Sequence, residues 1–298
     1  MSEPVADGLL PVDKPVGPTS HDVVAWCRRA LSTRRIGHTG TLDPFASGLL
    51  LLCVGRATRL AEYITALDKT YEAIVHLGVS TDTHDRQGTV VAESDLWRSV
   101  TEDQVEAALS DLRGAIEQVP PQFSAKKVGG EAMHRRARRG EYVDLPPVRV
   151  TVHELTLASF DPPELGLTVT CSSGTYVRAL ARDLGEALGV GAHLTALRRT
   201  AVGEFTADQA LPGADLQGGV SPERVEEFWI LPADALTHLE AVDVSADDAR
   251  QLAMGQWLET EATITEGVPI AVRESGRLIA VAVLEDGWLR PRKVFEGA

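Results

Sequence analysis

An apolar run of six residues, Leu49 to Val54, directly follows a segment rich in Gly, Thr and Pro, Gly37 to Gly48. A short apolar run bounded by turn residues is typical of a strand that is buried on both faces. The preceding segment, GHTGTLDPFASG, contains too many turn residues for a regular helix or strand. The sequence therefore predicts an irregular loop that is anchored by a rigid buried strand.

No membrane span is expected. The apolar run is far too short to cross a bilayer, and the chain does not begin with a basic stretch followed by a long apolar one. Its 298 residues, of which 44% are hydrophobic, suffice for about two domains with ordinary cores. We expect a soluble, cytoplasmic protein that does not contact the membrane.

Helix and strand patterns are interspersed over the first two thirds of the chain, as in an α+β fold. Helices are expected from a cap at Thr19 or Ser20 to a point before Ile36, over 57–66, from a Thr101–Gln104 capping box to about Leu112, and over Thr175–Leu188. Strands are expected over Tyr71–Val79, from Val148 onward with a bulge near His153, and over Gly166–Ser172 as its partner. Ser80 to Gly88 is expected to be a polar loop.

The pattern changes beyond Ala235. Hairpins are expected there, with turns at Ser275-Gly276 and Asp286-Gly287. A boundary region is expected over 215–222, followed by a short helix at 223–229. The sequence therefore predicts two domains, residues 1–230 and residues 235–298, of which the second is small and mainly β.

The charge is unevenly distributed. The formal net charge of −14 argues at first against a polyanionic partner. However, Phe205 to Leu289 contains 16 acidic and 4 basic residues, a balance of −12, which leaves only −2 for the rest of the chain. The basic residues form four bunches: Arg28, Arg29, Arg34 and Arg35; Lys126, Lys127, Arg135, Arg136, Arg138 and Arg139; Arg198 and Arg199; and Arg290, Arg292 and Lys293. One bunch is most simply a solvated surface, whereas four favour a phosphate-binding track.

The second bunch lies in a stretch with two prolines and a Gly129-Gly130 pair, residues 120–145. This composition predicts a mobile, positively charged arm with a short helix of its own, which would contact an RNA backbone. Solvation of a helix by the same charges is the alternative.

The sequence lacks the usual signature motifs of several enzyme classes. The chain has no GxxxxGK[ST] phosphate loop, no GxGxxG after a strand, no GxSxG elbow and no HExxH pair. The three cysteines, Cys27, Cys53 and Cys171, are widely separated, have no metal-binding spacing and are predicted to be reduced core residues. We therefore expect chemistry that uses neither a cofactor nor a metal.

Asp43 is the carboxylate of the Gly-rich loop. Pro44 restricts it to an extended conformation, while Gly37, Gly40 and Gly48 allow tight turns and close approach of a ligand. Considered alone, however, an Asp-Pro pair is more often a turn or a helix cap. The local sequence leaves open both a catalytic carboxylate and a structural turn.

The loop GHTGTLDPFASG resembles, almost letter for letter, the motif around the nucleophilic aspartate of the TruB family of tRNA pseudouridine synthases. Five other segments agree in the family's order: KPVGPTS from Lys14, KTYEA around Tyr71, PPQFSAKKVGGE from Pro120, SSGTYVRALARDLG from Ser172 and LRRTAVGEF from Leu197. The resemblance is close over about residues 8–205. The C-terminal stretch resembles a PUA-type RNA-binding domain less closely, through its hairpins and LRPRKVF from Leu289 to Phe295.

The resemblance implies conversion of the T-loop uridine at tRNA position 55 to pseudouridine, without cofactor or metal. It implies a catalytic domain with a mixed, largely antiparallel β-sheet and flanking helices, followed by a PUA-like C-terminal domain. The T-arm of tRNA is the implied partner, and RNA contact by the acidic C-terminal domain would be confined to the edge with Arg290, Arg292 and Lys293. No protein partner is implied, and a monomer suffices because one chain carries every motif.

The resemblance also assigns catalytic residues. Asp43 would be the nucleophile; attack on the ribose, attack on the base and formation of a glycal all remain open. Tyr71 would stack on the flipped uracil, and its hydroxyl could handle a proton. Arg178 would pair with Asp43 and keep it ionised. Without the family, Tyr71 would be interpreted as a core aromatic and Arg178 as a surface residue.

Further residues match positions around the substrate. His38 matches a histidine that fills the gap left by the flipped base, and Tyr176 would line the uridine pocket. Leu197 would form an apolar wall of that pocket, while Lys14 and Pro15 would brace the site. On the residues alone, His38 is equally a hydrogen-bonded structural histidine and Leu197 a core residue.

Three functions remain in competition: a tRNA uridine isomerase, an RNA-binding or RNA-folding protein with the same architecture, and an aspartate-based hydrolase of another glycosidic substrate. The second would be expected to lack the aspartate, although help in tRNA folding can coexist with catalysis. The third normally requires two carboxylates, and the motif contains one.

Overall fold

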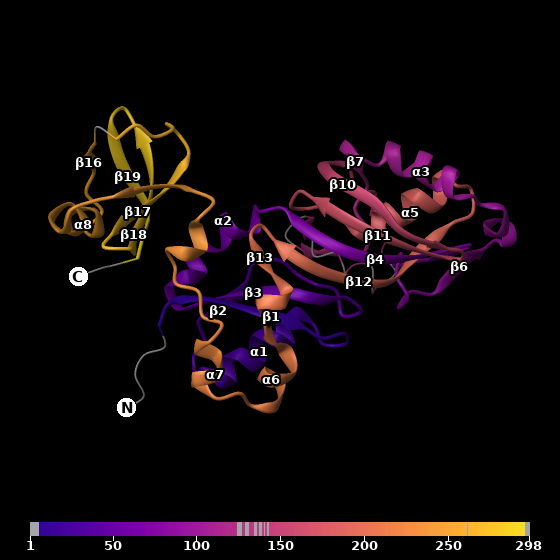
Figure 1. Cartoon of the computed structure of the whole chain (residues 1–298), viewed down its shortest axis with the longest axis horizontal. Helices are drawn as coiled ribbons and strands as arrows, with labels where there is room; N and C mark the ends of the chain where they lie inside the picture. Colours follow the sequence, from indigo (N-terminus) through magenta and orange to yellow (C-terminus); the bar gives the residue numbers. More distant parts are fainter. Residues whose placement is uncertain are drawn as a thin grey trace.

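The computed structural model describes residues 6–295, except for 124–126, 129–130, 134–135, 137–138, 140, 142 and 261. Its strands form a ten-stranded sheet, a five-stranded sheet and two small two-stranded sheets. The five-stranded sheet lies at one end of the elongated chain, the N-terminal strands lie in the middle, and β7, β10 and β11 lie towards the other end (Figure 1). This architecture confirms the predicted α+β class.

The main sheet has the strand order β14-β1-β3-β12-β4-β11-β10-β7, with β13 beside β12 and β2 beside β3. Its strands are β1 (Gly8–Lys14), β2 (Ile36–His38), β3 (Ser47–Val54), β4 (Lys69–Leu77), β7 (Gly114–Gln118), β10 (Val148–Asp161), β11 (Glu164–Cys171), β12 (Ala192–Val202), β13 (Phe205–Thr206) and β14 (Leu211–Pro212). Only the β1–β14 and β3–β12 pairs are parallel among these strands, so the sheet is mixed and largely antiparallel, as predicted.

Strand β3 is buried on both faces, which confirms the interpretation of the apolar run. Leu50 and Leu52 pack into a core that is covered by helix α1 (Ser20–Ala30). Leu49 and Leu51 point the other way, into a second core that includes α2 (Ala61–Thr65) and residues of the C-terminal sheet. All four leucines have no exposed surface. Alternation of side chains across the pleat explains how one strand serves two cores.

The helices begin where the capping signals are. Thr19 forms a capping box with Asp22 at the start of α1, and Thr101 forms one with Gln104 before α3 (Glu102–Asp111). Helix α5 (Val177–Ala187) begins directly after its N-cap residue Tyr176 and packs its buried face on the main sheet. The remaining short helices are η1 (Gly55–Leu60), η2 (Asp95–Ser99), η3 (Ala207–Gln209), α6 (Gly213–Gly218), α7 (Pro222–Glu226), η4 (Asp234–Leu236) and α8 (Ala246–Ala253).

Several predicted details of the strands are correct and some are wrong. The register of β10 with β11 shifts between Val152 and Glu154, which confirms the bulge near His153. Strand β4 ends at Leu77 rather than Val79, because Gly78 turns the chain at φ 84°. Val79 begins β5 (Val79–Thr81), which pairs with β6 (Val90–Glu93), so the predicted polar loop begins with a strand.

The C-terminal sheet has the order β15-β17-β18-β19-β16. Its strands are β15 (Glu240–Asp243), β16 (Leu258–Glu259), β17 (Pro269–Glu274), β18 (Arg277–Glu285) and β19 (Trp288–Val294). Both predicted hairpin turns are present, and Ser275-Gly276 and Asp286-Gly287 all have positive φ.

The segment predicted as a boundary region packs on the main body instead. Helix α6 lies against α1, and Ile230 exchanges backbone hydrogen bonds with Leu9 of β1. The second core also joins the two sheets, since Val281 and Phe295 of the C-terminal part are buried with Leu9. The exact division into residues 1–230 and 235–298 stays a prediction.

Gly48 provides a test of the β3 anchor. It has φ +102°, and a Cβ there would overlap the backbone of Arg199 on β12. Gly114 has φ +80° but open space around the same position. Gly114→Ala should cost about 1–2 kcal/mol from backbone strain alone. Gly48→Ala should cost about 1–3 kcal/mol more, because the strands must separate. Urea unfolding measures both free energies, and equal losses would contradict the close β3–β12 approach.

Candidate active site

The Asp43 loop is held by backbone hydrogen bonds on both sides of the aspartate. The Ser20 hydroxyl, at the start of α1, accepts from the Leu42 N–H at 2.9 Å and donates to the Leu42 carbonyl at 3.1 Å. The Gly17 N–H donates to the Pro44 carbonyl at 2.8 Å. The N–H of Ala46 closes a turn on the Asp43 carbonyl at 3.1 Å. These hydrogen bonds therefore give the loop between β2 and β3 a defined conformation.

Asp43 and Arg178 form an ion pair across this site. Arg178 Nε lies 2.9 Å from Asp43 Oδ2. The arginine side chain is only 5% exposed, whereas the Asp43 side chain is 35% exposed. One partner is thus fixed in the protein interior, and the other presents its carboxylate to an incoming molecule.

Arg178 has further partners that fix its position. Its Nη1 donates to the Thr83 carbonyl at 2.9 Å, and its Nη2 donates to the Phe123 carbonyl at 2.7 Å. Nη1 also lies 3.5 Å from Oδ2 of Asp85, whose side chain is 6% exposed. Asp85 accepts from the Thr83 hydroxyl at 2.8 Å and the Gln87 N–H at 2.9 Å. Arg178 therefore joins a buried, fixed carboxylate to a partly exposed one.

Asp85 was not among the residues predicted for the site. It lies in STDTHDRQG, which the sequence shows only as a polar loop. The pairs of hydroxyl and acidic residues in that segment are typical of a loop that bonds to itself. Nothing in the local pattern indicates that an arginine of α5 completes the network.

The pKa of Asp43 is raised above the ordinary carboxyl range, mainly because the surrounding protein desolvates the ionised form. Arg178 and, more weakly, Lys14 act in the opposite direction, while the negative charge of Asp85 adds to the rise. The ionisation of Asp43 is a balance between burial and these three neighbouring charges.

Tyr71 lies on β4 with 9% of its surface exposed. Burial raises the pKa of its hydroxyl, and the positive charge of the neighbouring Arg199 opposes that rise. The phenol therefore remains protonated at neutral pH and can act as a hydrogen-bond donor.

Arg199 is a second residue that the sequence did not single out for the site. It is 2% exposed, and its Nε donates to the Leu49 carbonyl at 2.7 Å and its Nη2 to the Gly40 carbonyl at 3.1 Å. It connects β3, the loop and Tyr71. Arg198, next to it, pairs with Asp13 at 2.8 Å. Arg199 is therefore part of the protein's own scaffold and is too buried to contribute to a phosphate-binding track, whereas Arg198 is ion-paired but partly exposed.

Lys14 is completely buried, and its Nζ donates to the carbonyls of Pro15 and Pro18 at 2.9 Å each. Burial lowers its pKa to about 8, although the charge of Asp43 opposes this change. The ammonium group fixes the turn that precedes α1 and adds a positive charge behind the Asp43 loop.

His38 ends β2, and its ring lies 5.5 Å from that of His21 in an edge-on arrangement. Its Nδ1 accepts from the Gly40 N–H at 3.3 Å. Burial lowers the pKa of His38 to about 4, so the imidazole is neutral at physiological pH.

Tyr176 and Leu197 lie on other elements, at the N-cap of α5 and on β12. The backbone of Tyr176 is fixed by Gln118, whose side chain accepts from the Tyr176 N–H at 2.8 Å and donates to its carbonyl at 3.1 Å. Leu197 of β12 is 8% exposed and lines a pocket of 360 Å³ together with Phe45 of the loop and Arg86.

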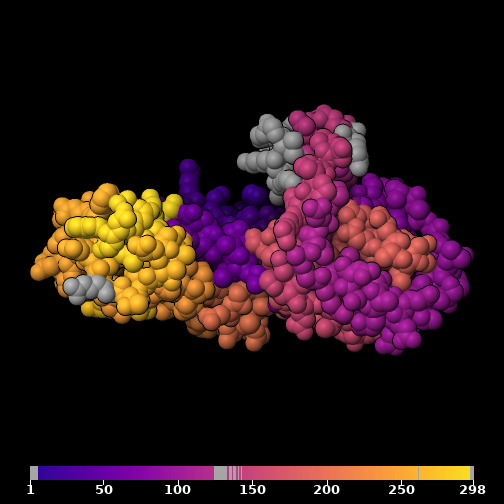
Figure 2. Space-filling view, turned by 90° about the horizontal axis from the view of Figure 1, so that it is seen from above, coloured from indigo at the N-terminus to yellow at the C-terminus, as the bar shows by residue number. Residues whose placement is uncertain are grey.

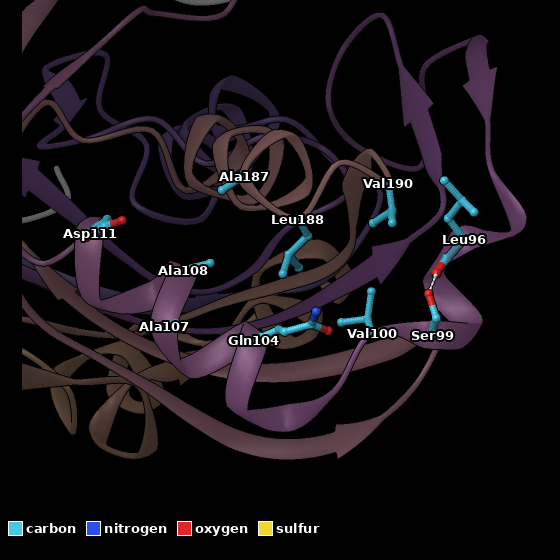
Figure 3. A pocket seen from close by; sticks show the side chains of 10 residues that line it. All are labelled: Leu96, Ser99, Val100, Gln104, Ala107, Ala108, Asp111, Ala187, Leu188 and Val190. Carbon is cyan, nitrogen blue, oxygen red and sulfur yellow. Dashed lines mark hydrogen bonds between the residues drawn. The ribbon is translucent and has the colours of Figure 1, made fainter.

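A larger pocket of 460 Å³ is separate from these residues. It lies among η2, α3 and the segment that follows α5, and Leu188, Val190 and Gln104 are among its lining side chains (Figure 3). It contains none of the charged groups around Asp43, so we do not assign the chemistry to it.

The predicted RNA-contacting arm lies partly outside the described residues. Lys126, Arg135 and Arg138 are outside them, as is the side chain of Lys127, which is in the short strand β8 (Lys127–Val128). Arg136 is described, and Arg139 pairs with Glu141 at 2.7 Å. The surrounding segment, coloured magenta to pink, projects from the body of the molecule (Figure 2).

The basic C-terminal edge is neutralised within the chain. Arg290 and Arg292 both pair with Glu285, at 2.6 and 2.5 Å, and Lys293 pairs with Glu62 at 3.0 Å. All three basic residues at the edge where RNA contact is expected therefore have an acidic partner within the chain.

The described part of the chain shows neither a candidate metal site nor a candidate membrane span. No group of three or more His, Cys, Asp or Glu residues there could hold a metal ion. No helix there is long and apolar enough to span a membrane. All three cysteines are buried and unpaired, as predicted.

The mixed sheet thus carries a loop whose aspartate, Asp43, pairs with the buried Arg178. The fold is similar to a chain of the H/ACA RNP bound to a substrate RNA containing 2′-deoxyuridine, with a TM-score of 0.74 and 26% identity over 97% of this chain and 85% of that one. A chain of the Cbf5-Nop10-Gar1 complex gives a TM-score of 0.75, with the same identity and coverage.

Residues 28–177 match the model of the TruB family pseudouridylate synthase N-terminal domain, and residues 178–237 match the tRNA pseudouridylate synthase B C-terminal domain. The chain is similar to tRNA pseudouridine synthase B of Corynebacterium efficiens, with 43% identity over 99% of this chain and 98% of the relative. The enzyme of that name from Thermobifida fusca is 45% identical over 99% of this chain and its whole length. The chain belongs to the TruB family of pseudouridylate synthases.

The charge balance around Asp43 predicts shifts of opposite sign in two variants. Asp85→Asn removes a negative charge that raises the pKa of Asp43, so this pKa should fall. Arg178→Gln removes the cation that lowers it, so this pKa should rise. Titration of ¹³C-labelled aspartate carboxyls by NMR measures both values. Shifts in the same direction would contradict the shared network.

The two neighbouring arginines of β12 provide a matched pair for stability. Arg199→Lys should cost about 1–3 kcal/mol, because one ammonium group cannot replace a planar fork that serves two buried carbonyls. Arg198→Lys should cost less than about 1 kcal/mol, because its ion pair with Asp13 is partly exposed. Equal losses in urea unfolding would show that Arg199 does not anchor the loop.

Proposed function

We propose that this pseudouridine synthase acts on the uridine in the T loop of tRNA, with Asp43 as its nucleophile. The ion pair of Asp43 with Arg178 carries the proposal, because it holds a partly exposed carboxylate in place on a buried cation. The relatives from Corynebacterium efficiens and Thermobifida fusca are both named tRNA pseudouridine synthase B. Support for tRNA as the substrate comes from these names and from membership of the family.

In the proposed reaction the uridine leaves the folded loop and enters the site as a flipped nucleotide. Asp43 attacks the nucleotide, the N-glycosidic bond breaks, and the uracil turns within the site. A carbon–carbon bond then forms between C5 of the base and C1′ of the ribose, and the bond between Asp43 and the nucleotide breaks, which releases the carboxylate. The C5 proton is lost and N1 gains one, so the product is an isomer of the substrate and no co-reactant is consumed.

The neighbouring residues have distinct proposed roles. Arg178 favours the ionised form of Asp43 and fixes its direction. Tyr71 stacks on the uracil, and its protonated hydroxyl is available for a proton-handling step. Neutral His38 occupies the place that the flipped base leaves, since an uncharged ring can stack among bases without a buried charge.

The remaining predicted residues shape the surroundings. Leu197 and Tyr176 border the uridine pocket, and Lys14 fixes the turn before α1. Arg136 and Arg139 are proposed to contact the RNA backbone together with Lys126, Lys127, Arg135 and Arg138. We propose a monomer that binds the T-arm, since one chain supplies every proposed site residue, and a cytoplasmic location for an enzyme of tRNA.

The decisive experiment uses an unmodified tRNA transcript and maps pseudouridine along it. The parent protein should modify the T-loop uridine, and Asp43→Asn should reduce the rate by at least about 10⁴-fold, because the nucleophile is lost. Asp95→Asn is the matched control, since this aspartate is 88% exposed on η2. Undiminished product with Asp43→Asn, or no product in the T loop with the parent protein, would refute the proposal.

A further inference from the structure

The turn between α1 and β2 carries a dense positive charge that the protein itself does not neutralise. Arg28, Arg29, Arg34 and Arg35 lie within this turn or at its edges, and all four are exposed. No acidic residue occurs between Asp22 and Asp43. Within the described ranges, none of the four guanidinium groups forms an ion pair. We call this group the α1–β2 cluster.

The cluster differs in this respect from two other basic bunches. Arg198 pairs with Asp13 and Arg199 is buried under the loop. Arg290 and Arg292 share Glu285. A chain with net charge −14 has carboxylates beside many of its cations, yet it leaves these four exposed without an ion pair among the described residues. Unpaired positive charge on an acidic protein is a binding surface for a polyanion.

Hydrogen bonds define the backbone of the turn that carries these charges. The Ser32 and Thr33 N–H groups donate to the carbonyls of Arg29 and Arg28, at 3.3 and 3.2 Å. Arg28 Nη2 donates to the Ile36 carbonyl at 2.9 Å, which closes the turn from the side. The Arg35 carbonyl accepts from the Gly55 N–H at 2.8 Å and ties the turn to the end of β3.

Two elements lead from the cluster to His38. Arg35 directly precedes β2, which ends at His38, and a strand rise of about 3.3 Å per residue places them about 10 Å apart. Helix α1 runs from His21, whose ring touches that of His38, to Arg29, a rise of about 12 Å. Both paths place the cluster within a few nucleotides of the proposed uridine site. Figure 1 shows α1 and β2 in the same central part of the molecule.

We propose that the α1–β2 cluster binds phosphates of the substrate RNA backbone beside the flipped nucleotide. This inference rests on the proposed function and adds a specific contact surface to it. Arginine is suited to the task because its planar group binds phosphate oxygens in a bidentate manner. The surface is charged and has no apolar patch of the kind that a protein partner would bury.

The test compares two double variants that each remove two arginines from the full chain. In Arg34→Ala/Arg35→Ala the lost charges are free, and in Arg290→Ala/Arg292→Ala they are paired with Glu285. Affinity for an unmodified tRNA transcript is measured as a function of salt. Each lost phosphate contact should reduce the slope of log K against log salt by about 0.7–0.9.

The Arg34→Ala/Arg35→Ala variant should therefore lose about 1.4–1.8 from the slope, whereas the control should keep the parent slope. The ratio of variant to parent Kd should fall about tenfold between about 50 and 200 mM salt. Arg34→Lys/Arg35→Lys should keep most of the slope, since it retains both charges. Circular dichroism and thermal unfolding verify that each variant is folded.

The chemical step should be unaffected at saturating protein, since neither arginine touches the proposed uridine site. An unchanged slope in Arg34→Ala/Arg35→Ala would overturn the proposal, as would an equal loss in both double variants, which would indicate only a bulk effect of charge. Failure of the parent protein to modify the T loop would instead refute the proposed function. The two failures are distinguishable because one concerns binding and the other concerns the product.

Discussion

The guanidinium group of Arg178 lies between two carboxylates, and the candidate site depends on this arrangement. Asp85 is buried and has other donors, so it is a fixed counter-charge, whereas Asp43 keeps about a third of its side chain exposed. A buried cation that lacks a paired counter-charge strongly destabilises the folded state. Because Asp85 and two backbone carbonyls already hold Arg178, its pairing with Asp43 orients the exposed carboxylate without burying it completely.

Arg199 holds the backbone around this pair. It connects the carbonyls of Leu49 and Gly40, and it also contacts Tyr71. The rigidity of β3, which is packed on both faces, is thereby transmitted to the loop that carries Asp43. The two arginines have complementary effects, since one positions a side chain and the other positions the main chain beneath it.

The features predicted correctly from sequence are those that depend on neighbouring residues. The capping boxes at Thr19 and Thr101 involve residues three positions apart, and the hairpin turns at Ser275-Gly276 and Asp286-Gly287 need only a positive φ at two adjacent positions. The bulge near His153 could be predicted because the alternation of apolar residues changes phase within a single strand. The composition of 215–222 does not reveal that its helix α6 packs against distant α1, because no local pattern records that contact.

The sequence by itself determined the buried strand, the loop that follows β2 and most helix starts. It also indicated Asp43 as the candidate catalytic residue. Periodicity and the order of motifs are properties of the chain and need no knowledge of the fold. Only the tertiary structure decided the partners of charged groups. The sequence does not distinguish the arginine pair Arg34-Arg35 from Arg198-Arg199 or from Arg290 and Arg292. In the structure the first pair is exposed without an ion pair among the described residues, whereas the other two are bonded within the protein. The physical reason is that Coulomb attraction and hydrogen bonding act through space, between residues that the fold alone brings within a few ångströms.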